Sequence, residues 1–462
     1  MDDTVKQALI GIVGKEHFTD SLIDLVSFTY DSSDHAHRPQ AAVWPENTEQ
    51  ISRILHLANK NRFPVTPRGA GTSLAGTAVP VRGGLVLDLS TMNRILDIRI
   101  ADRLAVVEPG VVYDALNKAL GAHGFFFPPD PASGKACTLG GNVATNAGGI
   151  RGAKYGVTKD YVLGLQVVLP DGRITRTGSA CMKSVSGYDL TRLFVGSEGT
   201  LGVVTEITLK VNPKPAAFKT ALASFAALID AGNAVTRIMR SGIIPSVLEI
   251  LDENTIRVLR EQGGMNLPEV EALILAETDG YTHAETDYQM RRIVEAFKAN
   301  GSTDIQVAET REASEKLWQI RKSASSTAAS LRPNNVSEDV TVPMSQVPNL
   351  LAGVSRICRG YGLVFVIFGH AGDGNLHPKI MYDAMNPEEA RRVHRASEEI
   401  FRLAIQLGGT LTGEHGIGLA KAPYMKFEHD PIAMEVMRSL KRLFDPNNIL
   451  NPGKMNLEEA ES

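Results

Sequence analysis

The stretch Pro67-Arg68-Gly69-Ala70-Gly71-Thr72-Ser73-Leu74-Ala75-Gly76 says most about how this chain folds. It follows an apolar run at 63–67, which predicts a buried strand that ends in a glycine-rich loop. Successive backbone N–H groups in such a loop can face one concavity and hold phosphate oxygens, because glycine puts no Cβ in the way. The spacing is neither Gly-x-Gly-x-x-Gly nor a Walker sequence, so a nicotinamide or ATP fingerprint is not supported.

Two further glycine-rich loops follow. The second reads Gly140-Gly141-Asn142-Val143-Ala144-Thr145-Asn146-Ala147-Gly148-Gly149, and the third reads Gly196-Ser197-Glu198-Gly199-Thr200-Leu201-Gly202. Three loops of this kind can wrap one long dinucleotide. The alternative is that they are tight turns between strands, and this alternative stays open for the third loop.

Composition describes a large globular protein. At 462 residues the chain predicts two or three domains. A hydrophobic fraction of 43% and a net charge of -4 provide no basic field for nucleic acid or for an anionic membrane surface. The three cysteines, Cys137, Cys181 and Cys358, have no Cys-x-x-Cys spacing, so neither a disulfide framework nor an iron–sulfur cluster is expected.

The expected location follows from the same features. Few cysteines and the absence of a signal pattern in the first residues favour a reducing cytoplasm. No apolar run approaches the roughly 18 residues of a spanning helix. Any association with a membrane is therefore expected to go through a partner.

The chain divides near Asn212-Pro213-Lys214-Pro215, since closely spaced prolines stiffen a connection. On both sides of this break, apolar periodicity predicts alternating strands and helices. The predicted helices lie at 48–61, 112–122, 224–240, 283–300, 312–331 and 388–407. The helix at 312–331 places Trp318, Arg321 and Ser325 on one face. Prolines and amides in 444–454 predict a series of turns.

A second kind of motif lies near the C-terminus. Gly369-His370-Ala371-Gly372-Asp373-Gly374-Asn375-Leu376-His377 follows a predicted strand at 363–368, and its glycine turn should return His377 beside His370. Further on, Gly413-Glu414-His415-Gly416 adds a carboxylate and another imidazole. A single histidine beside glycine is usually an ordinary turn residue. Two imidazoles and one carboxylate, however, leave coordination positions open on a divalent ion, as catalytic sites require.

Taken in order, these motifs resemble a known family. The loop at 67–73, the run at 140–149, Lys154-Tyr155-Gly156 and Ser186-Gly187-Tyr188-Asp189-Leu190 resemble the FAD-binding domain of the vanillyl-alcohol-oxidase type. With both histidine motifs, the chain is similar over about residues 20 to 456 to the FAD-linked D-2-hydroxyacid dehydrogenases. Within them it resembles the D-lactate dehydrogenase and glycolate oxidase catalytic-subunit group.

The resemblance implies an α+β fold. A two-subdomain FAD-binding domain would cover residues 1–213 and be completed by 420–462. A substrate or cap domain, built from an antiparallel sheet and helices, would cover 214–419 and contain the metal site.

The resemblance also implies the cofactor sites. The residues expected to bind FAD are Arg68, Gly69, Ala70, Gly71, Thr72, Ser73, Gly141, Asn142, Thr145, Gly202 and Asn451. Some relatives attach FAD through a histidine in the first loop; that loop has none here, so a non-covalent flavin is expected. His370, His377 and Glu414 match the family's metal ligands, with zinc as the first choice and manganese or iron close behind.

The implied reaction oxidises a small D-2-hydroxy acid, D-lactate first and glycolate second, to its 2-oxo acid. His415 matches the catalytic base, and Arg321 is the natural partner of the substrate carboxylate because its planar guanidinium can donate hydrogen bonds to two oxygens at once. Trp318 and Ser325 would shape the same pocket. Asn375 would orient the substrate or only support its turn, and Asp373 is expected to be a turn residue.

Two positions depart from the pattern. Relatives that act on larger dicarboxylic hydroxy acids carry a lysine where Ser337 stands, which favours a monocarboxylate here. Many relatives have an arginine where Met344 stands, and this substitution has no assigned effect.

Electrons must leave the flavin for another acceptor: an iron–sulfur subunit, an electron-transfer flavoprotein or a quinone. A second copy of the chain is a further expected partner. The alternative function is a non-catalytic subunit that binds flavin only as an electron relay. The Glu414-His415 pair argues against that, because a relay needs no base. A third reading, a flavin-dependent ether-lipid synthase, would be expected to have a different active-site pattern.

Overall fold

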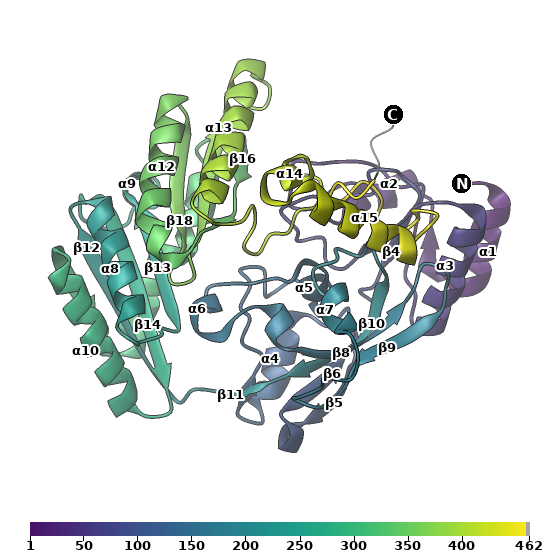
Figure 1. Cartoon of the computed structure of the whole chain (residues 1–462), viewed down its shortest axis with the longest axis horizontal. Helices are drawn as coiled ribbons and strands as arrows, with labels where there is room; N and C mark the ends of the chain where they lie inside the picture. Colours follow the sequence, from purple (N-terminus) through teal and green to yellow (C-terminus); the bar gives the residue numbers. More distant parts are fainter. Residues whose placement is uncertain (459–462) are drawn as a thin grey trace. The chain divides into compact units, whose positions relative to one another are not determined.

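The protein consists of two compact units. Its structure, a computed structural model, describes residues 1–458. Unit 1 comprises Met1–Gly148, Val157–Lys214 and the segment that begins at Glu414, and unit 2 comprises Gly149–Gly156 and Pro215–Gly413. Figure 1 shows the elements of both.

Unit 1 is built around two sheets. The first has the order β1-β2-β4-β3, with β2, β4 and β3 parallel, and the second is an antiparallel sheet of order β5-β6-β10-β8-β9. The strands are β1 (Phe18–Thr19), β2 (Ala41–Val43), β3 (Val65–Arg68), β4 (Leu85–Asp88), β5 (Ile95–Arg99), β6 (Leu104–Val107), β8 (Val162–Val168), β9 (Ile174–Gly178) and β10 (Val203–Lys210), with a small pair of β7 (Phe125–Phe126) and β11 (Asn212–Pro213). The helices are α1 (Asp3–Val13), α2 (Leu22–Leu25), α3 (Thr48–Asn61), α4 (Tyr113–Gly121), α5 (Leu139–Thr145), α7 (Leu190–Phe194), α14 (Met425–Glu428) and α15 (Pro431–Phe444).

Local sequence explains α3 well. The Asn47 side chain accepts a hydrogen bond from Gln50 N at the start of the helix, and Arg62 ends it in a left-handed conformation with φ 55. Its buried stripe packs into the core of the first sheet. The predicted helix at 48–61 is confirmed.

The C-terminal segment joins the first sheet. Val65 N donates to Ile449 O at 2.7 Å, and Asn451 N donates to Val65 O at 2.8 Å, so this segment runs beside β3. Ile449 and Leu450 are buried in the same core as β3. The end of the chain therefore completes unit 1.

Unit 2 is one antiparallel sheet with helices on it. The strand order is β15-β12-β14-β13-β18-β19-β16, and β17 also pairs with β19. The strands are β12 (Ala217–Phe225), β13 (Val247–Asp252), β14 (Ala272–Gly280), β15 (Ser302–Val307), β16 (Asn334–Ser337), β17 (Val340–Thr341), β18 (Val364–His370) and β19 (Asn375–Tyr382). The helices are α6 (Gly152–Tyr155), α8 (Leu228–Arg240), α9 (Glu253–Glu261), α10 (His283–Ala299), α11 (Arg311–Ala329), α12 (Val347–Gly360) and α13 (Pro387–Gln406).

The two faces of this sheet carry different helices. Leu251 of β13 and Phe368 of β18 face α9 and α11, and they share a core with Leu317 of α11. On the opposite face Phe297 of α10 packs edge-on against Phe225 of β12, with ring centroids 5.9 Å apart. Figure 1 shows α8, α10 and α12 on that side. Alternation along each strand thus decides which side chains lie under α11.

The units differ from the predicted domain limits at two places. Residues 414–419 belong to unit 1, because Leu419 N donates to Ala75 O at 2.8 Å and neighbouring amides are held there too. The segment 149–156 belongs to unit 2, where Tyr155 OH donates to Asp279 Oδ2 at 2.7 Å. These long-range contacts have no signature in the local sequence.

The second glycine loop is also not the loop that we predicted. Residues Leu139–Thr145 form α5, with Thr138 as its N-cap, because the Thr138 side chain accepts from Gly141 N at 3.3 Å. The buried Val143 anchors the helix in the core of the second sheet. Capping and burial outweigh the low helix propensity of two glycines. The sequence had likewise indicated no helix for α12 or α15.

Candidate active site

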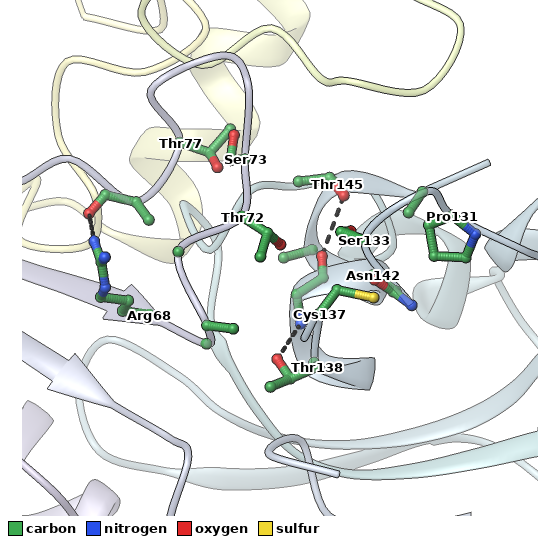
Figure 2. Close-up of a pocket in the computed structure, with 18 of the residues that line it drawn as sticks. Arg68, Thr72, Ser73, Thr77, Pro131, Ser133, Cys137, Thr138, Asn142 and Thr145 are labelled. Atoms are coloured by element: carbon green, nitrogen blue, oxygen red, sulfur yellow. Dashed lines mark hydrogen bonds between the residues drawn. The ribbon is translucent and has the colours of Figure 1, made fainter. Parts of the chain in front are cut away.

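A cavity of about 430 Å³ in unit 1 brings the glycine-rich segments together. Its walls come from the 67–78 loop, the start of α5 and the third loop at Glu198 and Gly199, together with Glu414 and His415. In Figure 2 Thr72 of the first loop lies across from Asn142 and Thr145 of α5. Of the expected flavin residues, those that line it are Arg68, Gly69, Ala70, Gly71, Thr72, Ser73, Gly141, Asn142 and Thr145.

The first loop packs tightly against the N-terminus of α5. A Cβ on Gly69 would lie 2.2 Å from Thr138 Oγ1, so only glycine allows the loop to approach so closely. Gly71 has a φ of 68, a left-handed conformation that glycine adopts without strain. The wall of the cavity is therefore formed largely by backbone and small hydroxyl side chains.

The Arg68 side chain points into the protein. Its guanidinium donates to Ser27 O at 3.3 Å and Ala78 O at 3.4 Å, and it lies over the Phe28 ring at 5.7 Å. Burial lowers the pKa of Arg68, against the opposing effect of Asp88 and other acidic neighbours. Arg68 therefore stabilises the loop, and its expected contact with the pyrophosphate stays a prediction.

The cavity fits a flavin dinucleotide. The Asn142 amide nitrogen is buried and has no hydrogen-bond acceptor among the described residues, so an acceptor atom of a ligand would satisfy it. The glycine-rich wall admits a pyrophosphate at close range. Burial raises the pKa of the nearby Cys137 thiol, which leaves it an uncharged part of the wall.

Gly202 and Asn451 are not among the residues that line this cavity, and a contact of either with the flavin stays a prediction. A Cβ on Gly202 would lie 2.5 Å from Val167 Cγ1, so this glycine permits packing of β10 against β8. Asn451 Nδ2 donates to Thr77 O at 2.9 Å and to Glu198 O at 2.7 Å. The asparagine thus ties the C-terminal segment to the first and third loops from behind the cavity wall.

Glu198 holds the segment that bears Glu414 and His415. Its carboxylate accepts hydrogen bonds from Ile417 N at 2.6 Å and Gly418 N at 2.9 Å. Burial raises the pKa of Glu198 to about 7, although these N–H groups and Lys454 oppose the rise. No local sequence pattern indicates this role, because the two segments are more than 200 residues apart along the chain.

Glu414 and His415 line the same cavity as the glycine loops. His415 Nε2 lies 3.9 Å from Glu414 Oε1, and both side chains are mostly buried. A Cβ on Gly148 would lie 2.9 Å from Glu414 Oε2, so the glycine after α5 makes room for this carboxylate. The predicted base is therefore part of the predicted flavin cavity.

Unit 2 brings the two histidines of the longer motif together, as predicted. His370 pairs with Asn375 and Phe368 pairs with His377 across β18 and β19, so both imidazoles lie on the same face of the sheet. Their ring centroids are 5.0 Å apart, at an interplanar angle of 82°, and both residues are buried.

Glu249 of β13 fixes the orientation of His370. Its Oε1 lies 2.5 Å from His370 Nδ1, and its other oxygen accepts from Arg321 Nε. Burial would raise the pKa of this carboxyl, but His370 and Arg321 together lower it to about 2. A carboxylate at Nδ1 is the usual arrangement around a metal-binding histidine that ligates through Nε2. Glu249 looks like any strand residue in the sequence, so no local signal identified it.

The three predicted residues of α11 do share one face, and each contacts the sheet. Trp318 Nε1 donates to Glu277 Oε2 at 2.9 Å, and Ser325 Oγ accepts from Lys379 Nζ at 3.0 Å. Arg321 pairs with Glu249 and lies over the Phe368 ring at 4.7 Å. The guanidinium of Arg321 thus engages the carboxylate that orients His370, and binding of the substrate carboxylate by Arg321 stays a prediction.

Asn375 and Asp339 organise the other side of the histidine pair. Asn375 Nδ2 donates to Asp339 Oδ1 at 2.6 Å and to Thr341 Oγ1 at 2.9 Å, which commits its amide nitrogen to the protein. Asp373 Oδ1 accepts from Asn375 N at 3.2 Å, the turn role that we predicted. Asp339 Oδ2 also accepts from Gly413 N at 2.9 Å, which fixes the residue directly before Glu414.

The donor set of unit 2 suits a divalent transition metal. Two buried imidazoles lie side by side, and a carboxylate sets the tautomer of one of them, as is usual around metal-binding histidines. The identity of the ion and the third ligand, Glu414, stay predictions.

The fold and the flavin cavity define a flavin-dependent oxidoreductase. Residues 39–178 match the family described as "FAD binding domain", and residues 214–455 match "FAD linked oxidases, C-terminal domain". The chain belongs to the family of FAD-linked oxidases, in the group that includes glycolate oxidase subunits and D-lactate dehydrogenases.

Several relatives are similar over most of their length. The chain is 45% identical to the "Glycolate oxidase subunit GlcD" of Bacillus subtilis (strain 168) over 459 residues, which cover 99% of this chain and 97% of that protein. It is 38% identical to "D-lactate dehydrogenase [cytochrome], mitochondrial" of Arabidopsis thaliana, over 90% of this chain and 73% of that protein.

Solved structures share the fold. p-Cresol methylhydroxylase superposes with a TM-score of 0.82 at 20% identity, over 98% of this chain and 96% of that chain. 4-Ethylphenol oxidase from Gulosibacter chungangensis gives 0.78 at 19% identity, with 98% and 96% covered. The predicted α+β fold of the vanillyl-alcohol-oxidase type is therefore confirmed. Among residues 1–458, no helix has the length and apolar character needed to cross a membrane.

Proposed function

We propose that this protein is an FAD- and metal-dependent dehydrogenase that oxidises a small D-2-hydroxy acid to the 2-oxo acid, D-lactate first and glycolate second. One observation carries the proposal: His370 and His377 lie buried and side by side, and a carboxylate orients one of them. Two buried imidazoles contribute little to the packing of a sheet, whereas a metal ion is held by such ligands. The names of the relatives, glycolate oxidase subunit and D-lactate dehydrogenase, support the substrate class.

Glu414 is the proposed third metal ligand. Gly413 N donates to Asp339 Oδ2. A Cβ on Gly413 would lie 2.4 Å from Asn375 Nδ2, so this glycine packs against the amide of Asn375, which comes two residues before His377 on β19. Glu414 is the next residue, about 3.8 Å further along the backbone. Zinc is the first choice, with manganese or iron as alternatives, since nitrogen and oxygen ligands suit all three.

His415 is the proposed general base. As a neutral imidazole it would take the proton of the substrate hydroxyl, whose pKa a bound cation lowers. FAD, when bound, supplies the acceptor for the hydride from C2. His415 lies in the flavin cavity itself, so proton removal and hydride transfer can occur at one place.

The electron acceptor is proposed to be an iron–sulfur subunit, an electron-transfer flavoprotein or a quinone. The three cysteines cannot form a cluster of their own by spacing, so a partner would have to provide one. The word "subunit" in the name of one relative and "cytochrome" in that of another fit electron transfer to a partner. A cytoplasmic location, with any membrane association through that partner, and a homodimer complete the proposal.

Anaerobic stopped-flow mixing with a panel of D- and L-2-hydroxy acids tests the function. We expect D-lactate to bleach the oxidised flavin and its L-enantiomer to leave it unchanged. Elemental analysis of the same sample should find about one divalent transition metal ion per chain. A flavin that no hydroxy acid reduces would instead support the alternative, a non-catalytic electron-relay subunit.

A further inference from the structure

One buried cation in unit 2 lacks a carboxylate partner. Lys379 of β19 is 6% exposed, and its Nζ donates to Ser325 O at 3.2 Å and Ser325 Oγ at 3.0 Å, both neutral acceptors. No carboxylate within residues 1–458 forms an ion pair with it. A buried ammonium without a counter-charge is costly, and proteins rarely keep one without a use for it.

Two buried acidic groups on this face are matched by cations. Glu249 lies between His370 and Arg321. Glu277 Oε1 lies 3.5 Å from a guanidinium nitrogen of Arg151, and Glu277 Oε2 accepts from Trp318 Nε1. Both acidic groups are therefore balanced by cations of the protein. Lys379 remains as a positive charge that nothing in the described part of unit 2 neutralises.

Lys379 also lies next to the histidine pair. It comes two residues after His377 on the same strand, so both side chains emerge from the same face, roughly 6.5 Å apart at their α-carbons. Ser337 of β16 is its direct cross-strand partner, and that position brings no charge. An anion bound at the histidine pair would thus have one fixed cation beside it.

We infer that Lys379 binds a carboxylate of the substrate, a role that sequence analysis had given to Arg321. This inference rests on the proposed function, because the carboxylate is that of a 2-hydroxy acid. For a monocarboxylic substrate it would be the C1 carboxylate. For a dicarboxylic substrate, Lys379 would take the second carboxylate and extend the substrate class to acids such as D-malate.

Three variants test the inference. Lys379→Met keeps the length of the side chain without its charge, and Lys379→Arg keeps the charge. Lys322→Met is the matched control, because Lys322 is exposed on α11, the same helix that carries Ser325. Flavin content and unfolding temperature, compared with the control, show whether each variant is folded.

The measurement is anaerobic flavin reduction by D-lactate, glycolate, D-malate and D-2-hydroxyglutarate. In Lys379→Met the half-saturating concentration should rise roughly 10- to 100-fold, since a hydrogen bond to a charged group has that effect. The limiting rate should change far less, and Lys379→Arg should recover part of the affinity. If the half-saturating concentration rises for all four acids, Lys379 binds the C1 carboxylate. If it rises only for the dicarboxylic acids, Lys379 binds the second carboxylate.

Binding of pyruvate and 2-oxoglutarate to the oxidised protein, followed by calorimetry, gives a readout that needs no turnover. It should weaken in Lys379→Met by a similar factor. Half-saturation and binding equal to those of Lys322→Met, or a fall in limiting rate alone, would overturn the inference while leaving the proposed function intact. If no acid reduces the wild-type flavin, both proposals fall together.

Discussion

The flavin cavity of unit 1 and the polar sheet face of unit 2 are built in opposite ways. The cavity wall consists largely of backbone, glycine and hydroxyl groups from a few contiguous segments, and the guanidinium of its arginine donates to the backbone carbonyls of Ser27 and Ala78. The sheet face consists of buried charges from β13, β14, β18 and β19 that meet residues of α11. A backbone site depends on local conformation, whereas a charged site depends on which strands become neighbours. The two regions should therefore respond differently to substitution.

The largest effect is expected for His415→Ala. Loss of general-base help should slow substrate-driven flavin reduction roughly 10²- to 10⁴-fold, while bound flavin is retained. Stopped-flow mixing measures the rate of flavin reduction, and the flavin absorbance of the purified protein measures how much flavin is bound. His123→Ala, on the exposed end of unit 1's α4 region, is the control. Unchanged reduction in His415→Ala would show that the cavity of unit 1 does not supply the base.

Glu249→Gln should have the next largest effect. Gln keeps the shape but removes the charge that orients His370, so metal affinity should fall roughly 10- to 100-fold. Arg321 would lose its buried counter-charge as well, so the free energy of unfolding should drop by about 3–5 kcal/mol. Metal titration and denaturant unfolding measure the two effects. The exposed Glu261→Gln is the control, and a Glu249→Gln protein that binds metal as tightly as this control would contradict the assignment.

Gly69→Ala probes the backbone site. The new Cβ would meet Thr138 Oγ1, and the resulting shift of the loop should cost about 1–3 kcal/mol. We expect weaker FAD binding with little change in metal content, measured by fluorescence titration of the apoprotein. Gly121→Ala is the matched control, since a Cβ there has nothing within 4 Å. Equal FAD affinity in both variants would argue against this loop as a cofactor wall.

The last prediction is a dependence of stability on pH through Glu198. Burial raises its folded pKa to about 7, above the ordinary value of 4.5, so between these values the folded state holds a proton that the unfolded state has released. The free energy of unfolding should fall as pH rises from about 4.5 to about 7, by at most about 1.4 kcal/mol per pH unit from this group. Glu198→Gln should flatten that slope in denaturant titrations at several pH values. A slope equal to that of the wild type would show that Glu198 does not titrate in this range.

The features predictable from the sequence differ between the two regions. The hairpin of His370 and His377 was predictable, because a strand, a glycine turn and a returning strand are contiguous. The same holds for the first glycine loop and for α3. Glu249 and Lys379 were not found, since an isolated glutamate or lysine in a strand has no pattern. For Arg321 the helical spacing predicts the face on which it lies, but it does not identify Glu249 as its partner on that face.

The amino-acid sequence by itself determined the family, several of the elements and the identity of the chemical groups: glycine loops, two histidines at a turn, and a Glu-His pair. These depend on residues close together along the chain, where backbone geometry is set locally. Only the tertiary structure decided which charges meet. The pairing of β13 with β18 gives His370 its carboxylate, the register of β19 under α11 leaves Lys379 without one, and the return of the C-terminal segment places Glu414 and His415 in the cavity wall. Such contacts join residues far apart in the chain, so they exist only once the sheets have formed.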